Sequence, residues 1–87
     1  MNLKKNSLRK YSKNEVRDWL LPGLWGQFTD VPDFEIEIQI TDDGLLVGGW
    51  RKKKFLHFRI TNEELETGTY KSQFGPRCVK LKEELAA

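Results

Sequence analysis

The 87 residues, 38% hydrophobic and 11% aromatic, suffice for one small folded domain, exclude a disordered chain and leave too little for a second core. One cysteine and one histidine exclude an intrachain disulfide and most metal sites, so we expect no metal and no cofactor. Without disulfides, and with no apolar run near the roughly 18 residues of a membrane span, the sequence favours a cytoplasmic protein that binds no membrane.

The net charge of +2 conceals a segregation of charge along the chain. Residues 1–13 carry five bases and no acid, and residues 30–43 carry six acids and no base. Residues 51–59 return to five bases and no acid. Blocks of this kind predict surface patches of opposite sign rather than an evenly mixed surface.

The chain opens with a polar, basic segment, residues 1–11, which we predict to be a flexible arm. Ser12 and Glu15 have the spacing of a capping box and predict the start of a helix. Its apolar stripe consists of Val16, Trp19 and Leu20. Pro22-Gly23 is expected to end this helix within about two turns.

After an apolar connector, Leu24–Phe28, the first strand and hairpin are predicted. Phe34–Ile40 alternates apolar with acidic or amide side chains, as a strand with one buried and one solvated face does. Asp42-Asp43-Gly44 predicts a hairpin turn, and Leu45–Trp50 the returning strand. Gly48-Gly49 inside that strand indicates a bulge, a bend or a close backbone approach.

Arg51–Lys53 is predicted to form a basic turn, after which a third strand is predicted over Lys54–Ile60. Two sets of side chains alternate in it: Leu56, Phe58 and Ile60 on one face, and Phe55, His57 and Arg59 on the other. Thr61–Glu64 repeats the capping-box spacing, which predicts a helical turn through Leu65 that Gly68 ends.

The C-terminal part is predicted to be extended: a fourth strand over Thr69–Phe74, a turn at Gly75-Pro76, another alternating segment at Arg77–Lys82, and a frayed tail at 83–87. The fold class is therefore α+β, with one domain over 12–82. A short N-terminal helix precedes an antiparallel meander of three to five strands. A bend at the glycine pair would let this sheet curl toward a small barrel.

The sharpest functional signal is a basic and aromatic run around the third strand. Rings on one sheet face can stack on bases while neighbouring cations neutralise phosphates. The predicted nucleic-acid-binding residues are this run and the arm: Trp50, Arg51, Lys52, Lys53, Lys54, Phe55, His57, Arg59, Lys4, Lys5, Arg9 and Lys10. The alternative is structural: Phe55 packs against the helix that bears Trp19, and residues 51–54 form a solvated loop.

The acidic stretch and the aromatic connector allow a second interpretation, in which they bind a protein partner. The residues of this alternative are Glu35, Glu37, Asp42, Asp43, Trp25 and Phe28. We favour structural roles for them. The two glutamates would pair across strands with lysine or arginine and protect a sheet edge. The connector rings would plug one end of the sheet.

No set of residues predicts catalysis, so we expect no enzyme. His57 is the one histidine available to a nucleophilic triad, and Cys78 lies beside Val79, as a buried, inert thiol would. The carboxylate pairs Asp42-Asp43 and Glu63-Glu64 fall at a turn and at a helix cap, where acids are common.

Two classes of function remain. The first is a small non-enzymatic nucleic-acid-binding accessory or regulatory protein that contacts single-stranded or distorted nucleic acid. The alternative is a protein-binding regulator or inhibitor, of the kind that phages and mobile elements encode. A homodimer formed by pairing of strand edges is compatible with either.

Overall fold

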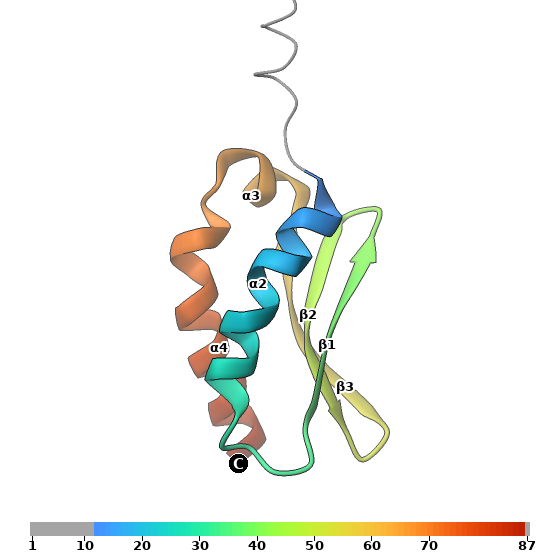
Figure 1. Cartoon of the computed structure of the whole chain (residues 1–87), viewed down its shortest axis with the longest axis vertical. Coiled ribbons are helices and arrows are strands. Elements are labelled where there is room, and N and C mark those ends of the chain that lie inside the picture. The colour runs from blue at the N-terminus through green and yellow to red at the C-terminus, as the bar shows by residue number, and fades with distance from the viewer. Residues whose placement is uncertain (1–11, 87) are drawn as a thin grey trace, which may run out of the picture.

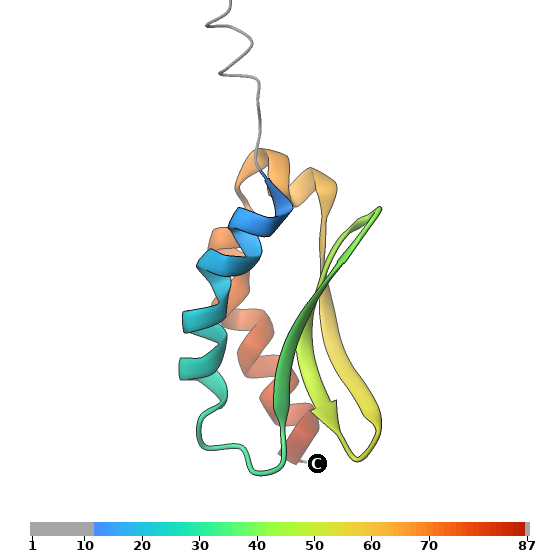
Figure 2. The same ribbon diagram turned by 45° about the vertical axis from the view of Figure 1, so that its right-hand side comes forward.

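The computed structural model describes residues 12–86, which place three helices on one side of a three-stranded antiparallel sheet. The elements are α2 (Lys13–Phe28), β1 (Glu35–Thr41), β2 (Gly44–Arg51), β3 (Lys54–Thr61), α3 (Asn62–Thr67) and α4 (Tyr70–Ala86). Figures 1 and 2 show α2 and α4 over the same face of the sheet, with α3 at the end where β1 turns into β2. The predicted α+β class is confirmed. None of these helices is both long enough and apolar enough to span a bilayer.

The helix α2 begins as predicted and ends later than predicted. The Ser12 side chain accepts a hydrogen bond from the Glu15 backbone N–H at 3.4 Å. The helix then continues through Pro22 to Phe28, because its buried positions recur every four residues: Val16, Leu20, Leu24 and Phe28. A proline inside a helix costs about 3 kcal/mol, whereas burial of a leucine and a phenylalanine returns about 1.5–3 kcal/mol each. Tertiary burial therefore outweighs the break.

The three strands pair in the order β1-β2-β3, and both predicted hairpins are present. The sheet is open, so the expected curl toward a barrel is wrong. The register runs without a bulge through the glycine pair, where Gly48 faces Glu37 on one side and His57 on the other.

The glycine pair instead marks a close approach, which was one of its three predicted meanings. A Cβ at Gly48 would overlap the backbone oxygen of Leu56. A Cβ at Gly49 would lie 2.7 Å from the ring of Phe34. The two glycines therefore let β2 lie between its neighbours without a displaced strand.

The capping box that opens α3 is confirmed. Thr61 accepts from the Glu64 N–H at 3.1 Å, and Glu64 accepts from the Thr61 N–H at 3.0 Å. Gly68 ends the helix in the left-handed region, with φ of 82°.

The two strands predicted at Thr69–Phe74 and Arg77–Lys82 are wrong, because both segments belong to α4. The helix places its apolar residues three or four positions apart, and Tyr70, Phe74, Cys78, Leu81 and Leu85 all pack on the core. The alternation that suggested a strand is accidental, since Val79 is 51% exposed and Leu81 is 3% exposed. The tail predicted to fray is helical through Ala86, so the domain extends beyond residue 82.

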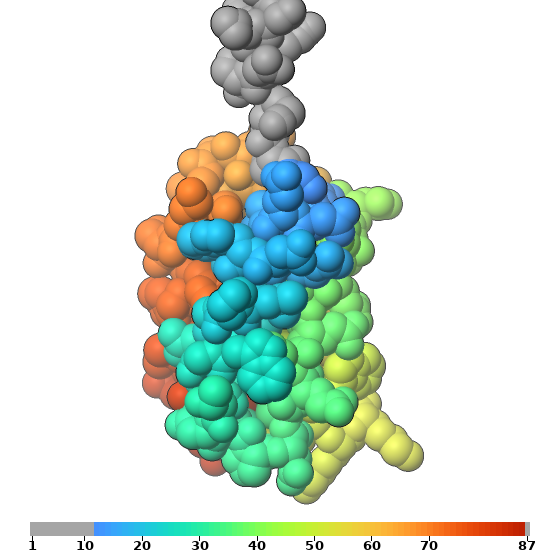
Figure 3. Space-filling model, in the orientation of Figure 1, coloured from blue at the N-terminus to red at the C-terminus, as the bar shows by residue number. Residues whose placement is uncertain are grey.

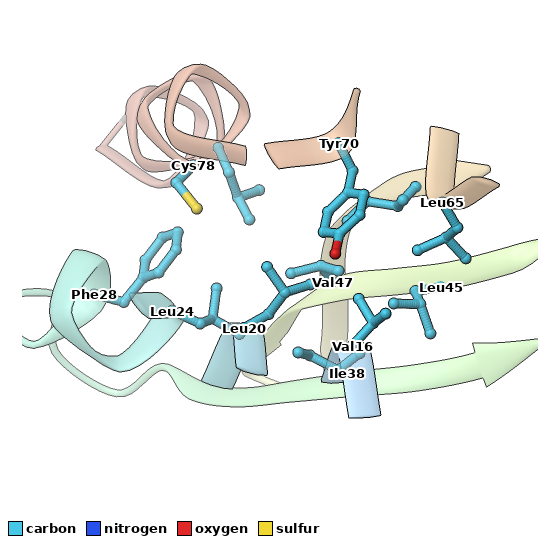
Figure 4. Packing of buried hydrophobic residues seen from close by; sticks show 12 residues of the cluster. Val16, Leu20, Leu24, Phe28, Ile38, Leu45, Val47, Leu65, Tyr70 and Cys78 are labelled. Atoms are coloured by element: carbon cyan, nitrogen blue, oxygen red, sulfur yellow. The ribbon is translucent and has the colours of Figure 1, made fainter. Parts of the chain in front are cut away.

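The core lies between the sheet and the helices (Figure 4). It is formed by Val16, Leu20, Leu24 and Phe28 of α2, by Ile38, Leu45, Val47 and Ile60 of the sheet, and by Leu65, Tyr70, Cys78 and Leu81 of α3 and α4. All of these side chains lie on one side of the sheet. Within residues 12–86, no element covers the other face, which is called the open face below.

Candidate nucleic-acid interface

The open face is defined by the strand register. Because side chains alternate along a strand, the residues that do not point toward the helices share this face. They are Glu35, Glu37 and Gln39 of β1, Leu46, Gly48 and Trp50 of β2, and Phe55, His57 and Arg59 of β3. The predicted division of β3 into two faces is thereby confirmed: Ile60 is buried, and Leu56 and Phe58 pack against the core.

Three rings form a contiguous aromatic cluster on the open face. Trp50 and Phe55 are register partners, with ring centroids 5.2 Å apart. Phe55 and His57, two residues apart on β3, are stacked at 4.8 Å. The alternative in which Phe55 packs against α2 is wrong, because the sheet separates Phe55 from that helix. We call Trp50, Phe55 and His57 the aromatic cluster.

Glu37 holds one end of the aromatic cluster. Its Oε1 accepts a hydrogen bond from the indole Nε1 of Trp50 at 2.6 Å, and its Oε2 accepts from Gln39 at 3.0 Å. Gly48 lies in register between Glu37 and His57 and has no side chain to fill the space, so the indole reaches diagonally to the carboxylate. Trp50 remains 37% exposed.

The β2–β3 turn brings positive charge to the end of the aromatic cluster. Lys52 and Lys53 form the turn, with φ of 49° and 65°, and Lys54 follows; all three are exposed. Figure 3 shows this yellow region projecting from the lower end of the molecule. Both turn residues occupy the left-handed region, where hairpins usually place asparagine and glycine.

Arg51 lies elsewhere and serves as a tether. Its guanidinium donates to the backbone oxygens of Leu85 at 2.9 Å and Pro32 at 3.2 Å. These bonds tie the end of α4 and the α2–β1 connection to the sheet. The structure thus separates Arg51 from the three lysines that follow it.

The acids of the open face lie along β1, which is an edge strand as expected. The predicted pairing of Glu35 and Glu37 with lysine or arginine is absent within residues 12–86. Arg59 pairs with Asp43 of the β1–β2 turn, and their charged atoms are 3.5 Å apart. Glu37 instead binds Trp50 and Gln39, and Glu35 is exposed opposite Trp50 in the register. The open face is therefore acidic along β1 and basic along β3.

A basic groove continues from the open face around the edge of β3, and sequence reasoning missed it. It lies between β3 and α4 with a volume of about 290 Å³. Its titratable lining consists of one acid, Glu84, and of His57, Arg59, Arg77 and Lys80. Arg77 also donates from Nη1 to the Arg59 backbone oxygen at 2.9 Å and pairs with Glu64. The bond with Arg77 lowers the pKa of Glu64 to about 2. Because the sequence predicts a strand over residues 77–82, nothing in it indicated that Lys80 lies beside Arg59.

The connector rings are distributed differently from the expectation that all of them plug the sheet. Phe28 is buried, with its ring 5.0 Å from Phe34, and is therefore not available to a partner. Trp25 is 60% exposed, as is Trp19, which contacts the edge of Tyr70. The buried positions of α2 recur every four residues through Pro22, and this period places both tryptophans on other faces. The four arm residues Lys4, Lys5, Arg9 and Lys10 lie outside the described residues.

The two residues considered for nucleophilic chemistry, Cys78 and His57, lie on opposite sides of the sheet. Cys78 is fully buried on the helix side, as expected, and desolvation raises the pKa of its thiol to about 11. His57 lies on the open face, so the sheet separates it from Cys78. No group of three or more histidine, cysteine, aspartate or glutamate side chains in the described part could hold a metal ion.

Comparisons of the chain with protein-family models, with curated proteins and with solved structures found no match.

Proposed function

We propose that the protein is a non-enzymatic nucleic-acid-binding accessory or regulatory protein whose open face contacts single-stranded or distorted nucleic acid. The observation that carries this proposal is the aromatic cluster, three adjacent rings on a sheet face that no described element covers. Stacking of a base on an aromatic side chain contributes about 1–3 kcal/mol and tolerates any sequence, because every base has a π-face.

The charges of the open face set the path of the bound strand across it. Lys52, Lys53 and Lys54 lie at one end of the aromatic cluster, and Arg59 and Lys80 lie along the β3 side. Glu35 and Glu37 lie along β1. Phosphates are attracted to the first set and repelled by the second. A single strand would therefore run along β3, with its bases over the rings and its backbone toward the groove between β3 and α4.

The backbone of the basic turn supports a functional role for its lysines. Two consecutive non-glycine residues with positive φ cost about 1–2 kcal/mol each relative to residues that adopt this region readily. Asn-Gly would form the same turn without that cost. The backbone strain at Lys52 and Lys53 lowers stability, and strain of this kind is typical of functional sites. It therefore favours a role for these two lysines in binding.

The test is a titration of labelled single-stranded DNA, single-stranded RNA and duplex DNA, followed by anisotropy at low and near-physiological salt. The expected result is saturable binding of a single strand that weakens steeply with salt. The variant Lys52→Ala/Lys53→Ala should bind more weakly. Its slope of log affinity against log salt should be reduced by about 0.7 for each phosphate that the variant leaves without a cation.

The matched control for this variant removes two lysines from α4, in Lys71→Ala/Lys82→Ala. Both variants lower the net charge equally, so a general electrostatic effect would weaken both. Binding that persists in the turn variant at the parental strength and salt slope would overturn the proposal.

A second candidate function, binding of a protein partner, is favoured by one observation. A groove of about 360 Å³ runs around the edge of β1 between Trp25 and Trp50 and includes Glu35 and Glu37. Exposed tryptophans are frequent anchors of protein interfaces. Trp25→Ala should abolish capture of such a partner and leave nucleic-acid binding intact, which separates the two functions.

A further inference from the structure

The two free edges of the sheet differ in how they are occupied. At the β3 edge, Arg77 donates to the Arg59 backbone oxygen at 2.9 Å, and the His57 ring nitrogen lies 3.2 Å from the Phe55 backbone oxygen. At the end of β1, Lys13 Nζ binds the backbone oxygen of Thr41, the register partner of Gly44, at 2.6 Å. Between Phe34 and Ile40, no side chain in residues 12–86 donates to or accepts from the β1 backbone. The β1 edge is therefore open to another strand.

The register shows which backbone groups of β1 are available. Thr41 and Gly44 flank a two-residue turn, so they form the closing hydrogen-bonded pair of the hairpin. Every second residue of β1, counted back from Thr41, therefore forms backbone hydrogen bonds with β2. The residues between them, Ile36, Ile38 and Ile40, direct their N–H and C=O groups away from β2. The turn between Arg51 and Lys54 gives β2 the same alternation, with each of its residues bonded to one neighbour.

We infer that the occupant of this edge is β1 of a second copy of the chain, paired antiparallel about a two-fold axis at Ile38. Residues whose N–H and C=O groups point away from β2 must pair with residues of the same kind in the second copy. With the axis at Ile38, Ile38 pairs with its own counterpart and Ile36 pairs with Ile40 of the second copy. This register overlaps the whole of β1, Glu35–Thr41.

Charge and strand overlap select this register over its neighbours. With the axis at Ile38, Glu37 lies opposite Gln39 of the second copy, an amide that can donate to the carboxylate. With the axis at residue 37, two Glu37 carboxylates would oppose each other. Like charges directly opposite in a sheet are destabilising. With the axis at residue 39, only residues 37–41 of the two strands would overlap, rather than the whole of β1.

The surroundings of β1 fit the same pairing. Lys13 lies beside Thr41, and this register places Glu35 of the second copy opposite Thr41. On the helix side, Ile40 is 43% exposed and would meet Ile36 of the second copy. The helix α2 packs mainly on β1 and also on β2, so the helices of the two copies would face each other across the seam. Trp25 and Leu21, four residues apart on α2, would line the seam between the two helices.

A two-fold axis through this edge is perpendicular to the sheet, so both open faces lie on the same side of one six-stranded sheet. The order is β3-β2-β1-β1-β2-β3. The two basic turns lie at opposite corners of the combined face. This inference does not depend on nucleic-acid binding, which uses the aromatic cluster and the basic turn. It competes with the protein-partner candidate, because the second copy would occupy the edge of β1 around which that groove runs.

The test is light scattering or sedimentation of the full chain over a wide range of concentration. The parent should show a reversible dimer. Gln39→Glu places a carboxylate opposite Glu37 at each of the two symmetric positions and should weaken the dimer roughly two- to thirtyfold. Gln39→Lys should tighten the dimer by a similar factor, and a gain cannot arise from misfolding.

Gln73→Glu and Gln73→Lys make the same changes on the exposed surface of α4 and are the matched controls. Their dissociation constants should equal that of the parent. A chain that stays monomeric at every concentration, or a dimer indifferent to the charge at Gln39, would overturn the inference.

Discussion

Arg77 of α4 donates from Nη1 to the backbone oxygen of Arg59 in β3 at 2.9 Å, and the same guanidinium pairs with Glu64 of α3. One side chain thereby joins both C-terminal helices to the edge of the strand that carries His57 and Arg59. The basic groove beside the open face depends on this tie, because it holds α4 at the edge of β3.

Stability at low pH should reflect the Glu64–Arg77 pair. The pKa of Glu64 is about 2 in the folded chain, against an ordinary value of 4.5, because Arg77 bonds its ionised form. A lowered folded pKa contributes stability that is complete above pH 4.5 and is lost as the pH falls toward 2. With solvent screening of a partly exposed pair, we expect about 1–2 kcal/mol from this group.

Urea unfolding at a series of pH values measures this contribution. Glu64→Gln should flatten the decline of the unfolding free energy between pH 4.5 and 2. Glu63→Gln, at the neighbouring exposed position of α3, is the control and should keep the parental profile. A profile that Glu64→Gln leaves unchanged would show that the pair is not formed in solution.

Pro22→Ala should raise the free energy of unfolding by about 1–3 kcal/mol, because an alanine at this exposed position restores the missing helical donor. Thermal and urea unfolding measure the change. Pro32→Ala, at an exposed position outside the helix, is the control. A loss of stability in Pro22→Ala would mean that the chain needs a break here and that α2 does not run through to Phe28.

Lys52→Asn/Lys53→Gly should stabilise the protein by about 1–3 kcal/mol, because the larger backbone entropy that glycine loses on folding offsets part of the relieved strain. The same variant should weaken nucleic-acid binding. The new residues adopt the left-handed turn without strain, and the two charges that we propose to contact phosphates are removed. Unfolding and anisotropy titrations on one preparation report both effects. A variant that gains stability and keeps full affinity would assign the strained turn no part in binding.

Phe55→Leu should lower the affinity for a single strand by about 1–2 kcal/mol while the chain stays folded, because a leucine keeps apolar contact with Trp50 and lacks the stacking surface. Trp19→Leu removes an exposed ring that lies away from the open face and is the control. Equal loss of affinity in both variants would argue for nonspecific contacts rather than for the aromatic cluster.

Local patterns predicted the first two-thirds of the fold. Several features that depend on neighbours in the chain are present in the structure: the Ser12 cap of α2, the capping box of α3, the alternation of Phe34–Ile40 and Lys54–Ile60, and both hairpin turns. The same patterns placed Phe55, His57 and Arg59 on one face. Proximity of Trp50 to Phe55 followed once the hairpin between them was recognised.

Local patterns were misleading where distant contacts decide the outcome. Pro22-Gly23 and Gly75-Pro76 are strong signals of a helix end or a turn, yet both lie within helices whose buried faces continue past them. Exposure of Trp19 and Trp25 likewise follows from which face of α2 meets the sheet. The burial that overrides each local preference involves residues far away in the sequence.

The sequence by itself determined the strands, their turns and the sign of charge on each segment, because these depend on alternation, φ preference and composition within a few residues. Only the tertiary structure decided that α4 is a helix, that Arg51 is a tether and that Lys80 joins Arg59 beside an open sheet face. Those outcomes depend on which surfaces are buried together, and burial is a property of the whole folded chain.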